Sequence, residues 1–538
     1  MSDLLNQASL VMVPSGYKED TVYSVVPSDG SGDLSFTRAS NGTRINSAGL
    51  VEVVAWNAIQ YSEDFANAVW GIPNGGSSVV VTSNATTAPN GTATADKIEI
   101  ANGTNDRIEQ VSTAPILTSG LPCTFSCYIK SVSGTGKVGI RSGQSGVSSV
   151  LSYTNEWQRL TWTFNAAATN EIPQFCNSTL VFGADSAPSF YAWGAQLNIG
   201  STAKPYFPTT DRLNVPRLTY QNGGGGCPSL LLEKQSTNIL TYSEDFTNAA
   251  WAKLDSGSGS TTPVVTANYA ISPDGTQNAD RLQCTLGSSG YSLIQQSPTL
   301  SGTHTGSIWV KSNTGANQNV YFRVSANSTA YVVTPEWQRI NITEANGDYL
   351  TIGLRDQTGY TNYSCDILIW GAQLEASSYA TSYIVSTSSS ATRVADDIAP
   401  KSLSSVGITS NYTLFFQLGQ CVLSAAESWI LQSSSGANTP FQIYGTTAIL
   451  YTSAGYIYPF SFLTTNPNND KVAVAYNGTN ITVFWNGVKM GQWTATTEWA
   501  NLTTLDLLYG ISTQVQYREV ALFNVGLSDA DAISLTTL

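Results

Sequence analysis

The chain has 538 residues, of which 41% are hydrophobic and only 11% are charged. This length exceeds what one hydrophobic core serves, and the hydrophobic content excludes a disordered chain. The net charge of −13, with 24 Lys plus Arg and no run rich in them, excludes the concentrated positive surface that nucleic-acid binding requires. No apolar run approaches the roughly 18 residues of a membrane span, so we expect no membrane insertion.

The first part of the chain, residues 1–55, holds two short strand-like pieces, each closed by a proline (Pro14 and Pro27). Its start lacks basic residues, and its apolar run Leu10–Val13 is too short for a secretory signal, so we expect folding in a cytoplasm. A segment this small usually docks on something else. We predict that it anchors the chain to a neighbouring protein; packing on the domain that follows is the alternative.

Two long stretches of the chain repeat each other. Nearly the same ten residues, YSEDFANAVW and YSEDFTNAAW, occupy 61–70 and 242–251. Further pairs follow in the same order: Pro89–Ile98 and Pro273–Leu282, Thr124–Ser131 and Thr305–Ser312, Glu156–Leu160 and Glu336–Ile340, Trp193–Leu197 and Trp370–Leu374. The chain therefore contains a duplicated domain, which we place at 56–212 and, with its linker, at 213–395.

The repeated pieces alternate as strands do, with successive side chains on opposite faces. One face of each final strand should therefore lie in the core: Tyr191, Trp193, Ala195 and Leu197 in the first copy, Leu368, Trp370, Ala372 and Leu374 in the second. Short strands, Pro-Asn-Gly and Pro-Asp-Gly turns and the lack of a long helical period indicate two β-sandwiches.

A second element recurs around the copies. An Arg, a turn-rich stretch and an apolar strand with a Glu (Glu52 or Glu233) precede each YSEDF, and TRVAD (Thr392–Asp396) follows the second copy. The run Gly223–Gly226 is predicted to be a turn or a flexible loop. It does not join a strand to a helix, which makes a phosphate-binding loop improbable.

The last part, 396–538, carries two Asn-Gly pairs, Asn477-Gly478 and Asn486-Gly487, each a strong hairpin signal. Near its end, REVALFNVGLSDADA predicts a strand followed by a short helix with Ser528 as the N-cap.

Taken together, the linker, YSEDF, P-D-G-T, EWQR and WGAQLE motifs resemble modules of tailed-bacteriophage head-spike and tail-fibre structural proteins, over residues 35–396. Such modules are similar to carbohydrate-binding jelly rolls. The VFWNGV hairpin and the closing strand are similar to laminin-G-like, concanavalin-type lectin domains. The resemblance implies an all-β protein of tandem jelly-roll sandwiches plus a concanavalin-like sandwich.

Tryptophans that match between the copies are assigned to the cores: Trp70, Trp157 and Trp193, with Trp251, Trp337 and Trp370. Glycan binding needs exposed aromatic faces beside polar groups. We predict it at tryptophans without a repeat partner, although a core role is open for each: Trp56, Trp162, Trp429, Trp493 and Trp499.

Calcium is the one cofactor that the resemblance makes plausible, since carboxylates and carbonyls hold it. Its candidate ligands are Glu63, Asp64, Glu244 and Asp245, with Asp96 and Asp280 beside them. The alternative is solvated surface charge.

We predict no enzyme. Adjacent carboxylates in a strand point to opposite faces, which does not suit a glycosidase pair. The single histidine, His304, is predicted at the surface, and the seven cysteines as buried free thiols.

The favoured function is structural: a head fibre, spike or tail fibre of a phage virion, assembled in the host cytoplasm. Its expected partners are other virion proteins through residues 1–55, further copies of the chain, and a bacterial surface glycan. The alternatives are a phage polysaccharide depolymerase and a secreted bacterial glycan-binding adhesin.

Overall fold

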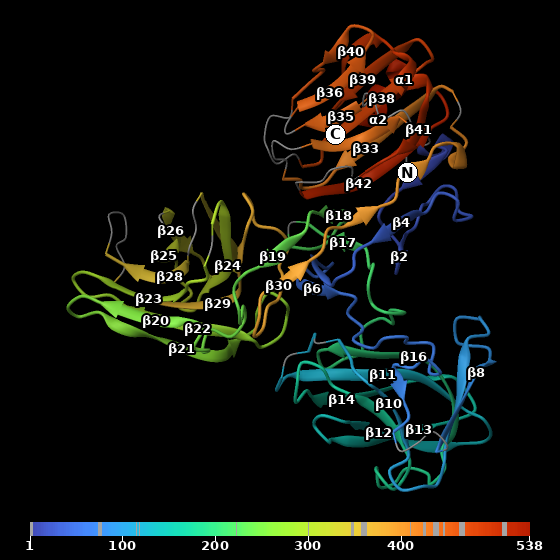
Figure 1. Cartoon of the computed structure of the whole chain (residues 1–538), viewed down its shortest axis with the longest axis vertical. Coiled ribbons are helices and arrows are strands. Elements are labelled where there is room, and N and C mark those ends of the chain that lie inside the picture. The colour runs from blue at the N-terminus through green and yellow to red at the C-terminus, as the bar shows by residue number, and fades with distance from the viewer. Residues whose placement is uncertain are drawn as a thin grey trace. The chain divides into compact units, whose positions relative to one another are not determined.

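The computed structural model describes residues 4–538 except 74–77, 115, 118, 222, 300, 326, 346–348, 357–362, 409, 423–426, 434–440, 445–446, 462–467 and 508–513. Almost all regular structure is antiparallel β-sheet, so the predicted all-β class is confirmed. The described helices are too short or too polar to cross a membrane. The strands of the sandwiches lie in stacked layers (Figure 1).

Sandwich 1 is the name we give to residues 53–213, which form a compact unit of their own. It has two five-stranded sheets. The first sheet runs in the order β14 (Gln158–Asn165), β11 (Pro122–Ser131), β16 (Ser189–Ile199), β9 (Ala95–Ile100), β8 (Val79–Thr86). The second runs β13 (Ser148–Tyr153), β12 (Gly136–Ser142), β15 (Pro173–Cys176), β10 (Arg107–Gln110), β7 (Trp70–Gly71).

Sandwich 2, residues 238–386, repeats this strand order strand for strand, as the duplication predicts. One sheet runs β27 (Gln338–Glu344), β24 (His304–Ser312), β29 (Ser364–Glu375), β22 (Ala279–Thr285), β21 (Thr261–Ala270). The other runs β26 (Asn327–Val333), β25 (Gln318–Val324), β28 (Leu350–Arg355), β23 (Tyr291–Gln296), β20 (Ala252–Ser256). In both sandwiches the Phe and Trp of the repeated YSEDF motif are buried in the core: Phe65 and Trp70, Phe246 and Trp251.

A third sandwich ends the chain. One sheet contains β17 (Arg217–Thr219), β18 (Ser229–Glu233), β42 (Gln514–Phe523), β33 (Tyr412–Leu418), β38 (Lys471–Tyr476), β39 (Asn480–Trp485) and β40 (Val488–Thr494), with β1 (Leu10–Met12) also paired to β42. The other contains β32 (Lys401–Ser402), β41 (Leu502–Leu505), β34 (Glu427–Ser433), β35 (Phe441–Tyr444), β36 (Thr447–Thr452) and β37 (Gly455–Ile457). The two sheets share one core.

The turns predicted in this third sandwich are present. Asn477-Gly478 lies between β38 and β39, and Asn486-Gly487 joins β39 to β40. The Ser528 side chain caps α2 (Asp529–Thr536) by accepting a hydrogen bond from the Asp531 N–H. Other helices are single turns: η1 (Leu5–Gln7), η2 (Ser404–Val406) and α1 (Thr497–Ala500).

The N-terminal segment, which we predicted to anchor the chain to a neighbouring protein or to pack on the domain that follows, pairs instead with the third sandwich. Leu10, Val11 and Met12 of β1 pair with Leu522, Ala521 and Val520 of β42. A segment with its own apolar side chains gains most when it completes the free edge of a larger sheet. Four short strands form a small sheet beside it: β2 (Tyr17–Lys18), β3 (Thr21–Val22), β4 (Leu34–Thr37) and β31 (Asp397–Ile398).

Unit 1 is the second compact unit and consists of residues 1–52 and 214–538. Sandwich 1 is therefore inserted, in the sequence, between two parts of one folded body. On either side of the insertion lie two hairpins: the cover hairpin, β5 (Gly42–Ile45) with β6 (Val51–Val54), and the β17–β18 hairpin. Two further strands, β19 (Ser236–Asn238) and β30 (Ala391–Arg393), pair at the base of sandwich 2.

The tips of these two hairpins meet backbone against backbone. The Gly225 N–H donates to the Ser47 carbonyl at 3.0 Å. A Cβ on Gly49 would lie 2.0 Å from the Gly223 carbonyl oxygen, and a Cβ on Gly224 would lie 2.4 Å from the Gly49 nitrogen. The glycine run is thus a close contact surface, where the sequence suggested a turn or a flexible loop.

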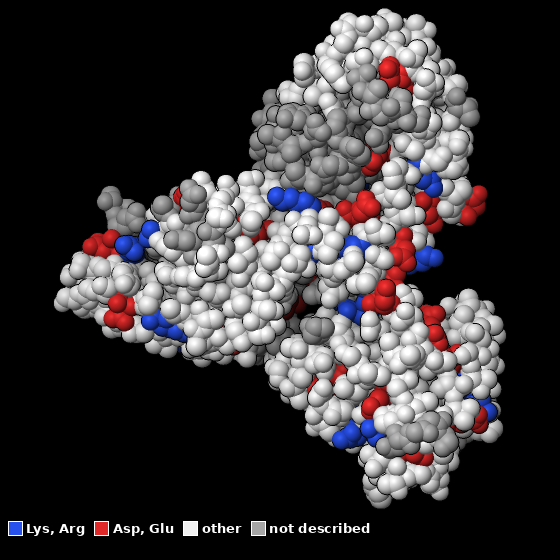
Figure 2. Space-filling view, in the orientation of Figure 1, with Lys and Arg blue, Asp and Glu red and all other residues white. Residues whose placement is uncertain are grey.

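Charged residues are sparse on the face that Figure 2 shows, and both signs are interspersed among uncharged residues. Two predictions about single residues need correction. His304 is only 2% exposed because it opens β24 opposite Glu344. Cys227 is exposed, whereas the other six cysteines are buried and all seven are free.

Candidate functional site

A bulge moves one tryptophan of each sandwich from the core to the outside. In β16 the residues Gly194 and Ala195 together face the single residue Cys127 of β11, and β29 has the same irregularity opposite β24. Gly194 and Gly371 adopt φ of 66° and 64°, a conformation that glycine reaches without strain.

This bulge corrects the predicted alternation. Ala195 and Leu197 lie in the core of sandwich 1, as predicted, but before the bulge Phe190 and Ala192 take the inner positions. Trp193 therefore joins a different cluster on the outer face of its sheet, and Trp370 does the same in sandwich 2. The predicted alternation is wrong here because one extra residue places every following side chain on the opposite face of the sheet.

The outer aromatic face of sandwich 1 consists of Tyr128, Trp157, Trp193 and Tyr206. The ring centroid of Trp193 lies 5.5 Å from that of Tyr128 and 4.9 Å from that of Tyr206. The Arg159 guanidinium lies over the Tyr128 ring at 5.7 Å. Only Trp193, at 5%, is fully buried; the other three rings are partly exposed.

Sandwich 2 has the equivalent face, made of Trp309, Trp337, Trp370 and Tyr383. Its ring centroids lie 4.8 to 5.4 Å apart among Trp309, Trp370 and Tyr383. Arg339 lies over Trp309 at 4.4 Å, so the cation has been retained as well. Here Trp370 and Tyr383 are 1% and 2% exposed.

A glutamate accepts a hydrogen bond from the tyrosine of each face. The Tyr206 hydroxyl donates to Glu63 at 3.0 Å, and the Tyr383 hydroxyl donates to Glu244 at 3.1 Å. Burial raises the pKa of Glu63, against hydrogen bonds from Tyr206 and Trp193 that lower it. Burial and then the nearby Asp274 raise the pKa of Glu244 to about 8.

The cover hairpin explains the deeper burial in sandwich 2. Ile45 and Val51 pack into the cluster of Trp309, Trp370 and Tyr383. The Val51 N–H donates to the Pro273 carbonyl at 2.9 Å, and the Thr43 hydroxyl donates to the Tyr383 carbonyl at 2.6 Å.

The matching part of sandwich 1 is open. Its turn closes as in sandwich 2, with Gly91 donating to Ala88 at 3.0 Å where Gly275 donates to Ser272 at 3.0 Å. Yet Pro89 is exposed where Pro273 is buried. A Cβ on Gly91 would meet nothing within 4 Å, whereas one on Gly275 would lie 2.9 Å from Leu50.

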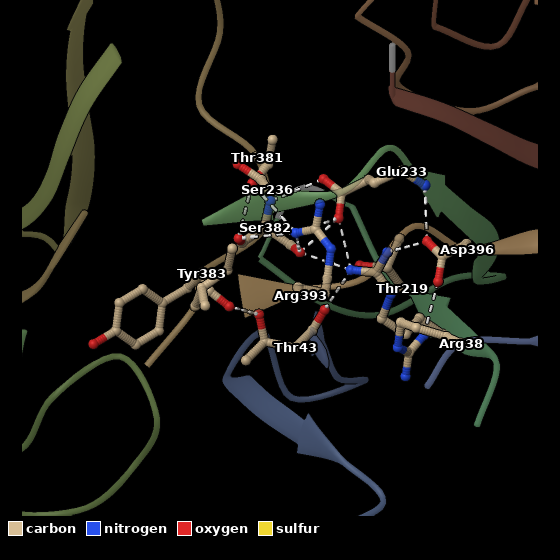
Figure 3. Close-up of polar contacts among 12 residues, drawn as sticks. Arg38, Thr43, Thr219, Glu233, Ser236, Thr381, Ser382, Tyr383, Arg393 and Asp396 are labelled. Atoms are coloured by element: carbon tan, nitrogen blue, oxygen red, sulfur yellow. Dashed lines mark hydrogen bonds and ion pairs between the residues drawn. The ribbon is translucent and has the colours of Figure 1, made fainter. Parts of the chain in front are cut away.

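Away from these faces, the recurring linker arginines Arg38, Arg217 and Arg393 meet Glu233 and Asp396 in a buried junction. Figure 3 labels Arg38, Arg393, Glu233 and Asp396 of this junction. Arg217 pairs with Glu233 at 2.6 Å and also with Asp396. Arg38 pairs with Asp396 at 2.8 Å, and Arg393 with Glu233 at 3.1 Å. The sequence repeated these arginines but gave no sign that they meet.

Hydrogen bonds complete the junction. Ser382 at the end of sandwich 2 donates to Glu233 through both its N–H (2.8 Å) and its hydroxyl (2.6 Å). Although burial alone would raise it, Arg393 and Arg217 hold the pKa of Glu233 at about 2. The junction therefore joins the hairpin after the insertion to sandwich 2 through buried, mutually paired charges.

Four of the five tryptophans predicted for glycan binding have described side chains, and each packs in different surroundings. Trp499 is fully buried and donates to the Tyr451 carbonyl, and Trp162 is 9% exposed and stacks on Phe164. Trp56 and Trp493 are partly buried, the former against Phe207 and the latter against the third core. The Trp429 side chain lies outside the described residues.

Sequence reasoning missed Trp157 and Trp337, which it assigned to cores. Each lies partly exposed at the margin of its aromatic face and donates to a backbone carbonyl, of Thr87 and Ile271 respectively, at 3.1 Å. The available signal was the EWQR motif itself, since its tryptophan stands among three polar residues in both copies.

The predicted calcium ligands also separate. Asp64 and Asp245 are exposed, while Glu63 and Glu244 face the aromatic clusters. Asp96 accepts the N–H groups of Phe65 and Asn84, and Asp280 those of Phe246 and Asn268, all within 2.9 Å. Burial raises the pKa of Asp280 to about 6. Within the described residues no three His, Cys, Asp or Glu side chains group as metal ligands.

No known protein family matches the chain, and no curated protein matches it. Among solved structures it is similar to the tandem CBM22-1–CBM22-2 domain of Paenibacillus barcinonensis Xyn10C, with 12% identity over 60% of this chain and 98% of that one and a TM-score of 0.20. It is also similar to the M60 catalytic domain with CBM51-1 and CBM51-2 of Clostridium perfringens ZmpB, with 12% identity over 66% of this chain and 42% of that one and a TM-score of 0.17. A third similar structure is the exo-β-1,3-galactanase of Phanerochaete chrysosporium, with 15% identity over 55% of this chain and 68% of that one and a TM-score of 0.17. At these TM-scores the likenesses carry no inference about ligand or activity.

Proposed function

We propose that the chain is a glycan-binding structural protein that binds its ligand on the outer aromatic face of sandwich 1. The observation that carries this proposal is the partly exposed group of Tyr128, Trp157 and Tyr206 around Trp193. Aromatic rings stack against the C–H faces of sugars, and nearby polar groups orient the sugar hydroxyls.

Polar groups of the required kind surround these rings. Thr94 accepts a hydrogen bond from the Trp193 indole at 3.2 Å, and Glu63 lies behind Tyr206. Asn90 and Thr92 are exposed on the adjoining turn. The face thus combines an apolar platform with a rim of hydroxyl, amide and carboxylate groups.

The test is a glycan array probed with the full chain and with two matched variants. Trp157→Ala should lose at least about 1 kcal/mol of binding, as aromatic contacts to a ligand usually contribute. Trp337→Ala, the equivalent change on the covered face of sandwich 2, should leave binding unchanged. Equal binding by both variants and the wild type would contradict the proposal.

We further propose that the protein is a head fibre, spike or tail fibre of a phage virion, displayed on the particle after assembly in the host cytoplasm. The ordered motif set supports this role. Contacts through residues 1–55 to other virion proteins, and association with further copies of the chain, belong to the same proposal. Antibodies against the full chain should label an appendage on intact particles in electron micrographs. Labelling of free protein alone would speak against it.

The proposed role is binding without hydrolysis. A glycosidase needs two carboxyl groups roughly 5–10 Å apart across its substrate. Each aromatic face has one carboxylate in hydrogen-bond contact with its rings, Glu63 or Glu244. Incubation of host polysaccharide with the full chain should release no reducing ends above the buffer level, and release abolished by Glu63→Gln would favour the depolymerase alternative.

A further inference from the structure

The cover hairpin shows what chemistry the aromatic face of sandwich 2 accepts. It supplies three kinds of contact: aliphatic carbons of Ile45 and Val51 on the rings, one hydroxyl donor, and one amide N–H donor. The hydroxyl is that of Thr43, on the Tyr383 carbonyl at 2.6 Å. The N–H is that of Val51, on the Pro273 carbonyl at 2.9 Å.

Sandwich 1 offers the same three contacts to a ligand. Tyr206 corresponds to Tyr383, since each hydroxyl bonds to the serine and the glutamate of the repeated YSEDF motif in its own copy. Pro89 corresponds to Pro273 in the shared turn. In the part of the chain that the structure describes, no hydrogen bond reaches the carbonyl of Pro89 or of Tyr206. The rings and both acceptors are therefore available together.

We infer that the ligand of sandwich 1 is a glycan containing an acetamido sugar. Such a sugar presents an apolar C–H face with a methyl group, hydroxyl donors, and one amide N–H donor on a single small unit. These are the three contacts that the cover hairpin makes in sandwich 2. A neutral sugar without the acetamido group supplies the C–H face and hydroxyls but lacks the methyl group and the amide N–H that match the contacts of Val51 in sandwich 2.

This inference rests on the proposed function and narrows its ligand class. The test compares three soluble probes with the same β-1,4 backbone: chitotetraose, its fully de-N-acetylated form, and cellotetraose. Titration calorimetry with the full chain should give at least tenfold tighter binding of chitotetraose than of either other probe. Trp157→Ala should abolish this binding and Trp337→Ala should leave it unchanged.

The outcomes separate the two proposals. Equal affinity for chitotetraose and cellotetraose, both lost in Trp157→Ala, overturns the acetamido inference and leaves glycan binding standing. Failure of chitotetraose to bind also overturns it, and the array then decides the proposed function through any other Trp157-dependent glycan. A cyclised peptide of residues 42–54 serves as a fourth probe. If it alone binds, and only when Trp157 is present, the face is a protein-docking surface and both proposals fall.

Discussion

Sandwich 1 and sandwich 2 have the same strand order, the same glycine bulge and the same outer cluster of rings, cation and carboxylate. They differ in what lies on that cluster. In sandwich 2 the cover hairpin and the arginine junction bind the domain into unit 1, whereas sandwich 1 is a separate compact unit with the equivalent surface open. The repeated surface is thus an intramolecular contact in one copy and is partly exposed in the other.

One substitution pattern follows this difference. The residue after the repeated WGAQL is Glu375 in sandwich 2 and Asn198 in sandwich 1. Both accept a hydrogen bond from the side-chain amide of the glutamine two residues earlier, Gln373 or Gln196. The charged version lies in the copy that borders the arginine junction, where Lys234 is close to Glu375. A carboxylate is stable when buried only near such cations, which accounts for the neutral amide in the other copy.

The largest effect is expected from breaking the junction. Arg217→Ala leaves Glu233 and Asp396 buried with one cation fewer each, and should lower the free energy of unfolding of unit 1 by about 3–5 kcal/mol. Differential scanning calorimetry should show the unit 1 transition shifting while the transition of sandwich 1 stays in place. Lys489→Ala is the control within unit 1, since its pair with Asp529 is largely exposed and should contribute less than about 1 kcal/mol. Equal shifts for the two variants would show that the junction does not stabilise unit 1 in this way.

A smaller effect is expected from loosening the cover. Val51→Ser removes an aliphatic side chain that is 7% exposed and packs on Trp309, Trp370 and Tyr383. The free energy of unfolding of unit 1 should fall by about 2 kcal/mol. Acrylamide quenching of tryptophan fluorescence should rise as Trp309 and Trp370 become accessible. Quenching that matches the wild type would mean that the hairpin does not shield these rings.

The raised pKa of Glu244 predicts a pH dependence of unit 1. Because burial and Asp274 raise its pKa to about 8 from the ordinary 4.5, the folded protein holds a proton that the unfolded chain has already released. Stability from this group is therefore complete at low pH and is lost as the pH rises through about 8, with a slope of at most about 1.4 kcal/mol per pH unit. Glu244→Gln should flatten this decline in denaturant titrations between pH 5 and 8. A slope identical to that of the wild type would contradict the assignment.

The smallest effect is expected from removing sandwich 1 altogether. Replacing residues 55–213 by a short glycine-serine linker keeps the whole cover hairpin and joins the two parts of unit 1, which cluster as one compact body. The free energy of unfolding of unit 1 should change by less than about 1 kcal/mol, because loop length contributes only weakly. Loss of the cooperative unit 1 transition would show that the inserted domain is needed for folding.

Sequence reasoning reached the fold because duplication and alternation are local signals. The paired YSEDF and WGAQL motifs predicted two equivalent sandwiches, and the Asn-Gly pairs marked hairpins that the structure contains. It failed at Trp193 and Trp370 because a bulge depends on one glycine at positive φ, which alternation cannot register.

The rest of the candidate site depended on long-range contacts. Ile45 and Val51 meet Trp370 across more than three hundred residues of sequence, as do Arg38 and Asp396. Nothing in the local pattern of either segment specifies its partner. The five tryptophans without a repeat partner were predicted to bind glycan on the assumption that residues shared by the two copies are structural and that unshared residues are functional. That assumption is wrong for Trp499, whose side chain is fully buried.

The glycine contact between the two hairpin tips lies on the hairpin that also packs on the aromatic rings of sandwich 2. Gly49 and Gly224 touch through main-chain atoms alone, on the same hairpin whose Ile45 and Val51 lie on sandwich 2. A methyl group at position 49 would lie 2.0 Å from the Gly223 carbonyl oxygen, so the backbone of one of the two tips would have to shift. The hairpin that packs on the rings of sandwich 2 is thus held at its other end by a contact that leaves no room for a side chain.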